Sequence, residues 1–146
     1  MRFDYLFVDC RGVRRVLYRL PELVDAIGSI RRIYVVEGEK NVEDLRSRGL
    51  VATTNPHGAG TWNSYGDAYG RSLAGAHVVL LADNDDPGRA HCAEVAHSVA
   101  PFVASLRLVD LSGLTSAGAD VSDWFAGGGS AAELERLADC AMPVPR

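Results

Sequence analysis

The sequence has very little lysine and no excess of positive charge. Lys40 is the single lysine among the 15 basic residues of the 146-residue chain, and the formal net charge is −4. Proteins that grip nucleic acid on their own usually present a basic surface. The composition therefore argues against nucleic-acid binding through overall charge, and such a role needs local basic patches or a partner domain.

Cysteine is also scarce. The three cysteines, Cys10, Cys92 and Cys140, form no Cys-x-x-Cys pair, and the four histidines have no ligand spacing with them. An odd number of scattered cysteines argues against both a disulfide framework and a zinc ribbon. We expect reduced, structural cysteines and no zinc site within this chain.

Long apolar runs are missing as well. No segment is long and apolar enough to span a bilayer, the first residues lack the pattern of a signal peptide, and no internal repeat is present. The length suits one domain with a sizeable core. These features predict a soluble, cytoplasmic protein without membrane contact.

Short apolar segments alternate with helical patterns along the chain. Strands are predicted within residues 32–39, 50–55, 76–85 and 104–112. Helices are predicted within residues 21–29, 41–49, 64–75, 86–102, 120–129 and 130–141. This alternation predicts an α/β fold with a mostly parallel central sheet of about four strands flanked by helices.

The predicted elements suggest three parts. A β-hairpin around a Cys-Arg-Gly turn and a helix occupy residues 1–30. A catalytic core covers residues 31–129, and a C-terminal helix and tail cover residues 130–146. The hairpin and first helix are expected to lead into the core.

Two of the predicted strands end in acidic residues: Glu37 follows one, and Asp83 and Asp85 follow another. In extended chain, residues i and i+2 point to the same side, so the Asp pair repels itself unless a cation is bound. Oxygen ligands on a short scaffold suit Mg²⁺ or Mn²⁺, although a turn before a helix explains the pair equally well. Asp86, directly before Pro87, is either the helix cap or an auxiliary metal residue.

The stretches VVEGEKN and LLADNDDPG together resemble the Toprim domain shared by topoisomerases and primases, in which Glu-Gly and a later Asp-x-Asp close strands of a Rossmann-like sheet. The resemblance runs from about Arg31 to Ala126. VRRVLYRLPEL, GLVATTNPHGAGTW and DVSDWF are further similar to the Toprim region of phage, prophage and plasmid primases and primase-helicases. Those proteins usually carry a zinc-binding domain and often a helicase, so we expect an excised domain or the product of a shortened, prophage-derived gene.

The resemblance implies a role for each matching acid. Glu37 corresponds to the family's catalytic general base or acid, and Asp83 and Asp85 correspond to its Mg²⁺ ligands. Asp120 resembles a late acidic motif, and it either completes the metal cluster or caps the helix that follows it. Asn41 stands where many primases have Asp, so it is at most an auxiliary residue that adds no charge to a second metal.

Several residues near these motifs are candidates for phosphate or nucleic-acid contact. Arg89 lies near the start of the helix after the Asp pair, and helix N-termini attract anions. The glycine-rich loop offers Asn55, His57 and Gly58, whose backbone N–H groups can bind phosphate. Lys40 is either a phosphate contact or a solvated residue at a helix start.

Three functions remain open. The first is Mg²⁺-dependent nucleotidyl transfer in RNA primer synthesis on single-stranded DNA from nucleoside triphosphates, with a separate zinc-binding domain or a replicative helicase needed for full activity. The second is a small Toprim nuclease that hydrolyses phosphodiesters. The third is a non-catalytic, truncated interaction module.

Overall fold

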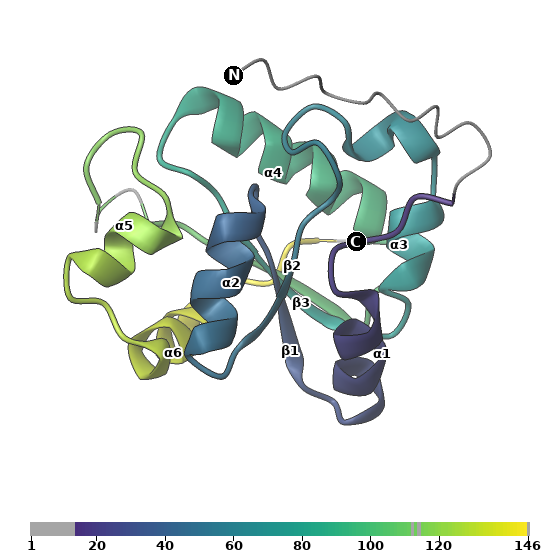
Figure 1. Ribbon diagram of the computed structural model, residues 1–146, viewed down its shortest axis with the longest axis horizontal. Helices are drawn as coiled ribbons and strands as arrows, with labels where there is room; N and C mark the ends of the chain where they lie inside the picture. Colours follow the sequence, from purple (N-terminus) through teal and green to yellow (C-terminus); the bar gives the residue numbers. More distant parts are fainter. Residues whose placement is uncertain (1–13, 112, 114, 146) are drawn as a thin grey trace, which may run out of the picture.

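A computed structural model describes residues 14–111, 113 and 115–145, and its described part has a four-stranded parallel sheet (Figure 1). The strands are β1 (Arg32–Val35), β2 (Val51–Thr53), β3 (His77–Leu81) and β4 (Ser105–Val109). Their order is β2-β1-β3-β4, and every neighbouring pair is parallel. The predicted α/β class and the mostly parallel sheet flanked by helices are confirmed.

The strand order changes direction next to β1. The chain passes from β1 to β2 on one side and then returns to β3 on the other side of β1. Val35 and Leu80 are register partners near the ends of β1 and β3. In open α/β sheets, ligands bind beyond the carboxyl ends of the strands at such a switch point.

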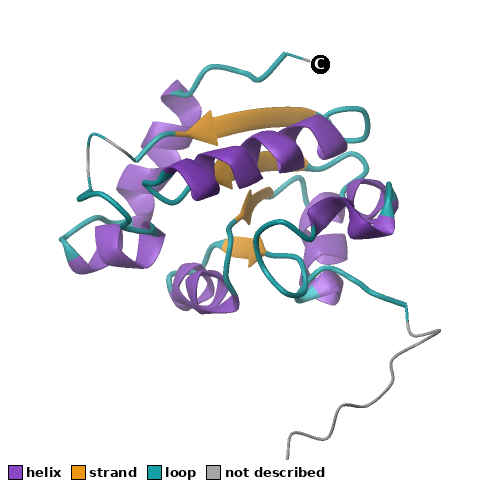
Figure 2. Ribbon diagram, turned by 90° about the horizontal axis from the view of Figure 1, so that it is seen from above, coloured by secondary structure: helices purple, strands orange, loops and turns teal. Residues whose placement is uncertain are grey.

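Helices cover both faces of the sheet (Figures 1 and 2). They are α1 (Leu20–Gly28), α2 (Glu39–Ser47), α3 (Ala68–Ser72), α4 (Asp86–Val99), α5 (Val121–Ala126), α6 (Ala131–Cys140) and the 3₁₀ helix η1 (Trp62–Tyr65). Ile33 and Val35 pack with residues of α1, α3 and α4, whereas Tyr34 and Val36 pack with residues of α2, α5 and α6. Because both faces of the sheet are covered, the central strands β1 and β3 are continuous apolar runs after their first residue. None of the helices in the described residues has the length and apolar character needed to cross a bilayer.

Local sequence explains where several helices begin and break. Pro21 lies in the first turn of α1, where its missing N–H costs nothing. The Ser130 hydroxyl accepts a hydrogen bond from the backbone N–H of Glu133 at 3.2 Å and caps α6. The helix predicted across residues 64–75 is instead split into η1 and α3, since Gly66 between them takes a φ of 57°.

The structure corrects the predicted N-terminal β-hairpin in the part that it describes. The first half of that hairpin lies outside the described residues, and residues 14–19 form no strand. Instead, Leu17 is fully buried, and the Tyr18 N–H donates to the Thr54 carbonyl at 2.9 Å. The Thr53 hydroxyl donates to the Tyr18 carbonyl at 2.7 Å. These bonds to the end of β2 take the place of a ladder with a hairpin partner.

The C-terminal tail is attached to the opposite edge of the sheet. Pro143 forms an antiparallel bridge with Arg107 of β4, and the Val144 N–H donates to the Leu106 carbonyl at 2.9 Å. Residues on both sides of the predicted core, such as Leu23 of α1 and Leu134 of α6, are fully buried in its two apolar clusters.

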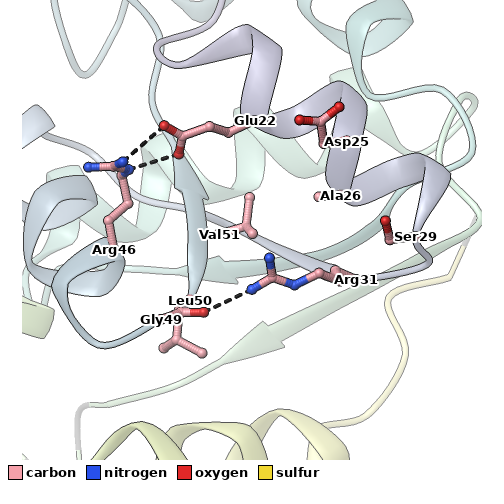
Figure 3. Close-up of a pocket in the computed structure, with 9 residues that line it drawn as sticks. All are labelled: Glu22, Asp25, Ala26, Ser29, Arg31, Arg46, Gly49, Leu50 and Val51. Atoms are coloured by element: carbon pink, nitrogen blue, oxygen red, sulfur yellow. Dashed lines mark hydrogen bonds and ion pairs between the residues drawn. The ribbon is translucent and has the colours of Figure 1, made fainter.

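A shallow hollow of about 330 Å³ lies between α1 and the start of β2 (Figure 3). An ion pair between Arg46 and Glu22, with Nε and Oε2 2.8 Å apart, spans it, and Arg31 donates to the Gly49 carbonyl at 2.9 Å. The hollow is at the amino ends of β1 and β2. It is therefore at the opposite end of the sheet from the acidic motifs. The ion pair that spans it links α1 to α2.

Candidate functional site

The two acidic motifs lie beyond the carboxyl ends of the two central strands. Glu37 comes two residues after β1, and Asp83 comes two residues after β3. The Thr54 hydroxyl donates to the Glu37 carbonyl at 2.8 Å, and the Asp85 N–H donates to the Asp83 carbonyl at 2.8 Å. Because β1 and β3 are hydrogen-bonded neighbours, both carboxyl groups reach the same edge of the sheet.

The Asp83 carboxyl group is in an unusual electrostatic environment. The pKa of Asp83 is raised to about 7, first by burial and then by the charge of Glu37. A hydrogen bond in which protonated Asp83 donates to Glu37 acts in the same direction, as do the charges of Asp120 and Asp85. The structure therefore brings the four predicted acids close enough to oppose one another's ionisation.

Two of these acids also cap helices. Asp85 Oδ1 accepts from the Gly88 N–H at 2.7 Å at the start of α4. Asp120 Oδ1 accepts from the Asp123 N–H at 2.9 Å, and Asp123 Oδ2 accepts from the Asp120 N–H at 3.0 Å, which is a capping box for α5. The alternative that Asp120 caps α5 is confirmed, while its place in a metal cluster stays a prediction, with its charge acting on Asp83.

The donor chemistry of this cluster suits a hard divalent cation, because all four side chains offer carboxylate oxygens. In each of the carboxylates of Asp85 and Asp120, Oδ1 accepts the hydrogen bond of the helix cap. Among the described residues, Oδ2 of each accepts no such bond, so one oxygen of each carboxylate is not engaged by a cap. No three His, Cys, Asp or Glu side chains of the described residues are already arranged to hold a metal ion. Glu37, Asp83, Asp85 and Asp120 are the residues that would hold one, and their side chains would have to rearrange to do so.

Asp86 is not the cap of α4. The cap is Asp85, and Asp86 is the first helical residue, with its side chain 96% exposed. Its carboxylate pairs with Arg89, with Oδ1 and Nη2 2.7 Å apart, and Arg89 Nη1 also donates to Asn84 Oδ1 at 3.3 Å. Lys40 is exposed in the first turn of α2, and its side chain makes no hydrogen bond or ion pair among the described residues.

Asn41 is used in helix packing. It is 5% exposed, and its Oδ1 accepts from the Ser122 hydroxyl at 3.4 Å. This contact joins α2 to α5. The amide is therefore already engaged within the protein.

The loop after β2 lies beside Glu37. The buried Asn55 Nδ2 donates to the Gly58 carbonyl at 2.9 Å and to Thr61 Oγ1 at 2.8 Å, which fixes the loop from inside. His57 and Gly58 both have a φ of 70°, and a Cβ on Gly58 would lie 3.7 Å from the Glu37 carbonyl oxygen. Asn55 thus shapes the loop, and His57 and Gly58 border the acidic cluster.

His91 is a buried residue of the site that the sequence patterns do not predict. It is 5% exposed, and neither ring nitrogen has a hydrogen-bond partner. Burial lowers the pKa of His91 below its ordinary value, against the opposing charges of Glu37 and Glu94. The buried face of α4 includes His91, Val95 and Val99, so the i, i+4, i+8 spacing was the available signal.

We expect His91→Leu to make the protein more resistant to acid. Because the folded-state pKa of His91 is below the unfolded value of 6.5, the unfolded state binds more protons, and stability falls as the pH drops below about 6.5. Urea unfolding at pH 7.5 and pH 5 should show that His91→Leu loses less stability than wild type between the two pH values. Asp83 titrates in the same range in both proteins, so the comparison isolates His91. Equal losses in wild type, His91→Leu and the exposed control His97→Leu would contradict this expectation.

Comparisons with known proteins add little to this picture. No protein-family model and no curated protein matches the chain. A similar chain occurs in the structure of the bacteriophage T7 lagging-strand DNA polymerase interacting with primase domains of two gp4 subunits bound to an RNA/DNA hybrid and dTTP. The identity is 21%, the TM-score is 0.48, and the match covers 78% of this chain and 56% of that chain. The chain therefore spans little more than half the length of that similar chain, and the case for a function rests on the residues of the site.

Proposed function

We propose that this chain is a Toprim-type domain that carries out Mg²⁺- or Mn²⁺-dependent nucleotidyl transfer, as in RNA primer synthesis by a primase-like protein. The observation that carries the proposal is the meeting of Glu37 and Asp83 beyond the carboxyl ends of the neighbouring strands β1 and β3, at the switch point of the sheet, with the charges of Asp85 and Asp120 also acting on Asp83. The order and spacing of the Glu-Gly and Asp-x-Asp motifs support the Toprim assignment.

The proposed roles follow from position. Glu37 acts as general base on the attacking 3′-hydroxyl, since a carboxylate beside a cation is suited to accept that proton. Asp83, Asp85 and Asp120 would hold the cation, and Asp83 would have to be ionised to do so, which a bound cation favours. The bound cation would neutralise triphosphate charge during in-line displacement.

The proposed substrates are nucleoside triphosphates and single-stranded DNA. With a net charge of −4, the chain has no general attraction for DNA, so we expect full activity to depend on partners. A separate zinc-binding domain or a replicative helicase would supply template binding in the proposed setting.

A template-directed primer assay tests the proposal. The chain is incubated with labelled nucleoside triphosphates, mixed-sequence single-stranded DNA and Mg²⁺, and a known phage primase serves as positive control. We expect weak incorporation that disappears with EDTA. No product, together with no heat of Mg²⁺ or Mn²⁺ binding by calorimetry, would overturn the proposal. Asp83-dependent cleavage of the DNA instead of incorporation would assign the site to a Toprim nuclease, and metal binding without either reaction would leave a non-catalytic module.

A further inference from the structure

A basic and aromatic cluster lies next to the acidic site. It consists of Arg15, His57 and Tyr65, and we call it the Arg15 cluster. Arg15 Nη1 is 3.1 Å from His57 Nε2, and the Arg15 guanidinium carbon is 6.0 Å from the centre of the Tyr65 ring. An arginine can only donate, so His57 Nε2 is the acceptor of this hydrogen bond.

Among the described residues, Arg15 has no carboxylate partner. Arg19, Arg46 and Arg89 each form ion pairs with carboxylates, at 2.6 to 3.1 Å. Arg15 forms no ion pair with any carboxylate among the described residues and contacts the His57 imidazole instead. A guanidinium stays protonated at all physiological pH values, so a full positive charge remains at this surface.

Tyr65 is an aromatic ring held at the surface by buried rings. It is 39% exposed and packs edge-on against Tyr69, with ring centres 5.8 Å apart. Tyr69 in turn packs edge-on against Trp62 at 5.3 Å, and both of these residues are fully buried. This stack fixes the Tyr65 ring before any ligand arrives, which lowers the entropy cost of stacking on it.

The cluster is joined to the catalytic acids through one turn of backbone. His57 precedes Gly58, whose Cβ position is 3.7 Å from the Glu37 carbonyl oxygen. The positive φ of 70° at His57 is uncommon for a residue with a side chain and is held by the hydrogen bonds of Asn55. An extended ligand that is bound to the Arg15 cluster could therefore reach Glu37 along this turn.

We infer that the Arg15 cluster binds single-stranded nucleic acid, with Arg15 on a backbone phosphate and a base stacked on Tyr65. A cation without a carboxylate partner in the described part of the chain, beside an exposed aromatic ring, is the combination by which proteins hold single strands without sequence preference. It also supplies a local positive charge on a chain whose net charge is negative. The inference rests on the proposed function only for the destination of the strand, which is the site of Glu37 and Asp83.

Fluorescence anisotropy with a labelled 12-nucleotide single strand, measured on the full chain in EDTA, tests the inference. We expect Tyr65→Ala to weaken binding roughly tenfold and Tyr65→Phe to keep most of the affinity. We expect Arg15→Ala to weaken binding and to reduce the slope of log affinity against log salt by about one. The control Arg136→Ala removes the same charge from an exposed position of α6 and should change affinity little.

Several outcomes would overturn the inference. They are no binding of the strand by the wild type, equal losses in Arg15→Ala and Arg136→Ala, or no loss in Tyr65→Ala. Complete displacement of the strand by one nucleoside triphosphate, with both ligands weakened by Tyr65→Ala, would assign the cluster to the nucleotide. Because the measurement needs neither metal nor turnover, failure of the primer assay leaves its result intact, and Asp83→Asn should still bind the strand.

Discussion

Asp83→Asn is expected to abolish nucleotidyl transfer and to stabilise the metal-free protein. The substitution removes a proposed cation ligand, and we expect activity to fall by about 100-fold or more because bound-cation charge stabilisation is worth several kcal/mol. It also removes a half-buried carboxylate surrounded by Glu37, Asp85 and Asp120, so metal-free stability at pH 8 should rise. A residue needed only for packing would not separate the two effects in this way.

The raised pKa of Asp83 determines how the stability of the metal-free protein changes with pH. Because the pKa of Asp83 is raised from 3.8 to about 7 in the folded state, the folded protein holds an extra proton between these values. The stability that depends on this proton is complete below about pH 4 and is lost as the pH rises through 7. Wild type should therefore lose stability over this range without metal, and Mg²⁺ should restore it at pH 8.

Thermal unfolding at pH 5 and pH 8, with and without Mg²⁺, measures both effects. Asp83→Asn should show a smaller loss between the two pH values than wild type and no stabilisation by Mg²⁺. The matched control Asp25→Asn, an exposed position on α1, should behave like wild type. If Mg²⁺ stabilises Asp83→Asn as much as wild type, Asp83 is not a ligand.

Gly88→Ala is expected to disrupt the site and the fold together. A Cβ at this position would lie 2.8 Å from both the Asp83 Cβ and the Asp83 carbonyl oxygen, and 3.0 Å from Asp85 Oδ1. The first contacts involve backbone and a Cβ, so relief requires the start of α4 to move away from β3. We expect a loss of about 1–3 kcal/mol in the free energy of unfolding, as for other overpacked positions, and Mg²⁺ binding weakened at least about tenfold.

Urea unfolding and calorimetry with Mg²⁺ check this expectation. Gly28→Ala is a suitable control because nothing lies within 4 Å of its Cβ position and its φ is not positive. It should leave both stability and Mg²⁺ binding close to wild type. A Gly88→Ala protein with wild-type stability would show that the Asp83 turn is not packed against α4 in solution.

The sequence predicts the sheet and the meeting of its acids because both depend on regular rules. Strands buried on two faces must be continuously apolar, which identifies β1 and β3. Parallel neighbours then carry Glu37 and Asp83 to one edge. The Ser130 cap is also predictable, since it needs only a hydroxyl three residues before Glu133.

Other features escape prediction because competing local solutions exist or because the contacts are distant in sequence. Asp85 and Asp86 are equivalent candidates for a cap, and only the helix start decides between them. The contact of Arg15 with His57 joins residues 42 positions apart, and no periodicity encodes it. The N-terminal hairpin is mispredicted in its described part because Tyr18 satisfies its backbone groups at the end of β2 instead.

The pairing of the C-terminal tail with β4 has a consequence for association between molecules. β4 is an outer strand, and outer strands offer unpaired backbone groups to strands of other chains. Here Pro143 and Val144 already occupy that side, and a proline has no N–H with which to recruit a further strand. Leu108 of β4 is apolar and 42% exposed, so it would add apolar contact area to such an association between chains. Pro143 and Val144, which lie outside the proposed site, thus protect this edge from pairing with strands of other molecules.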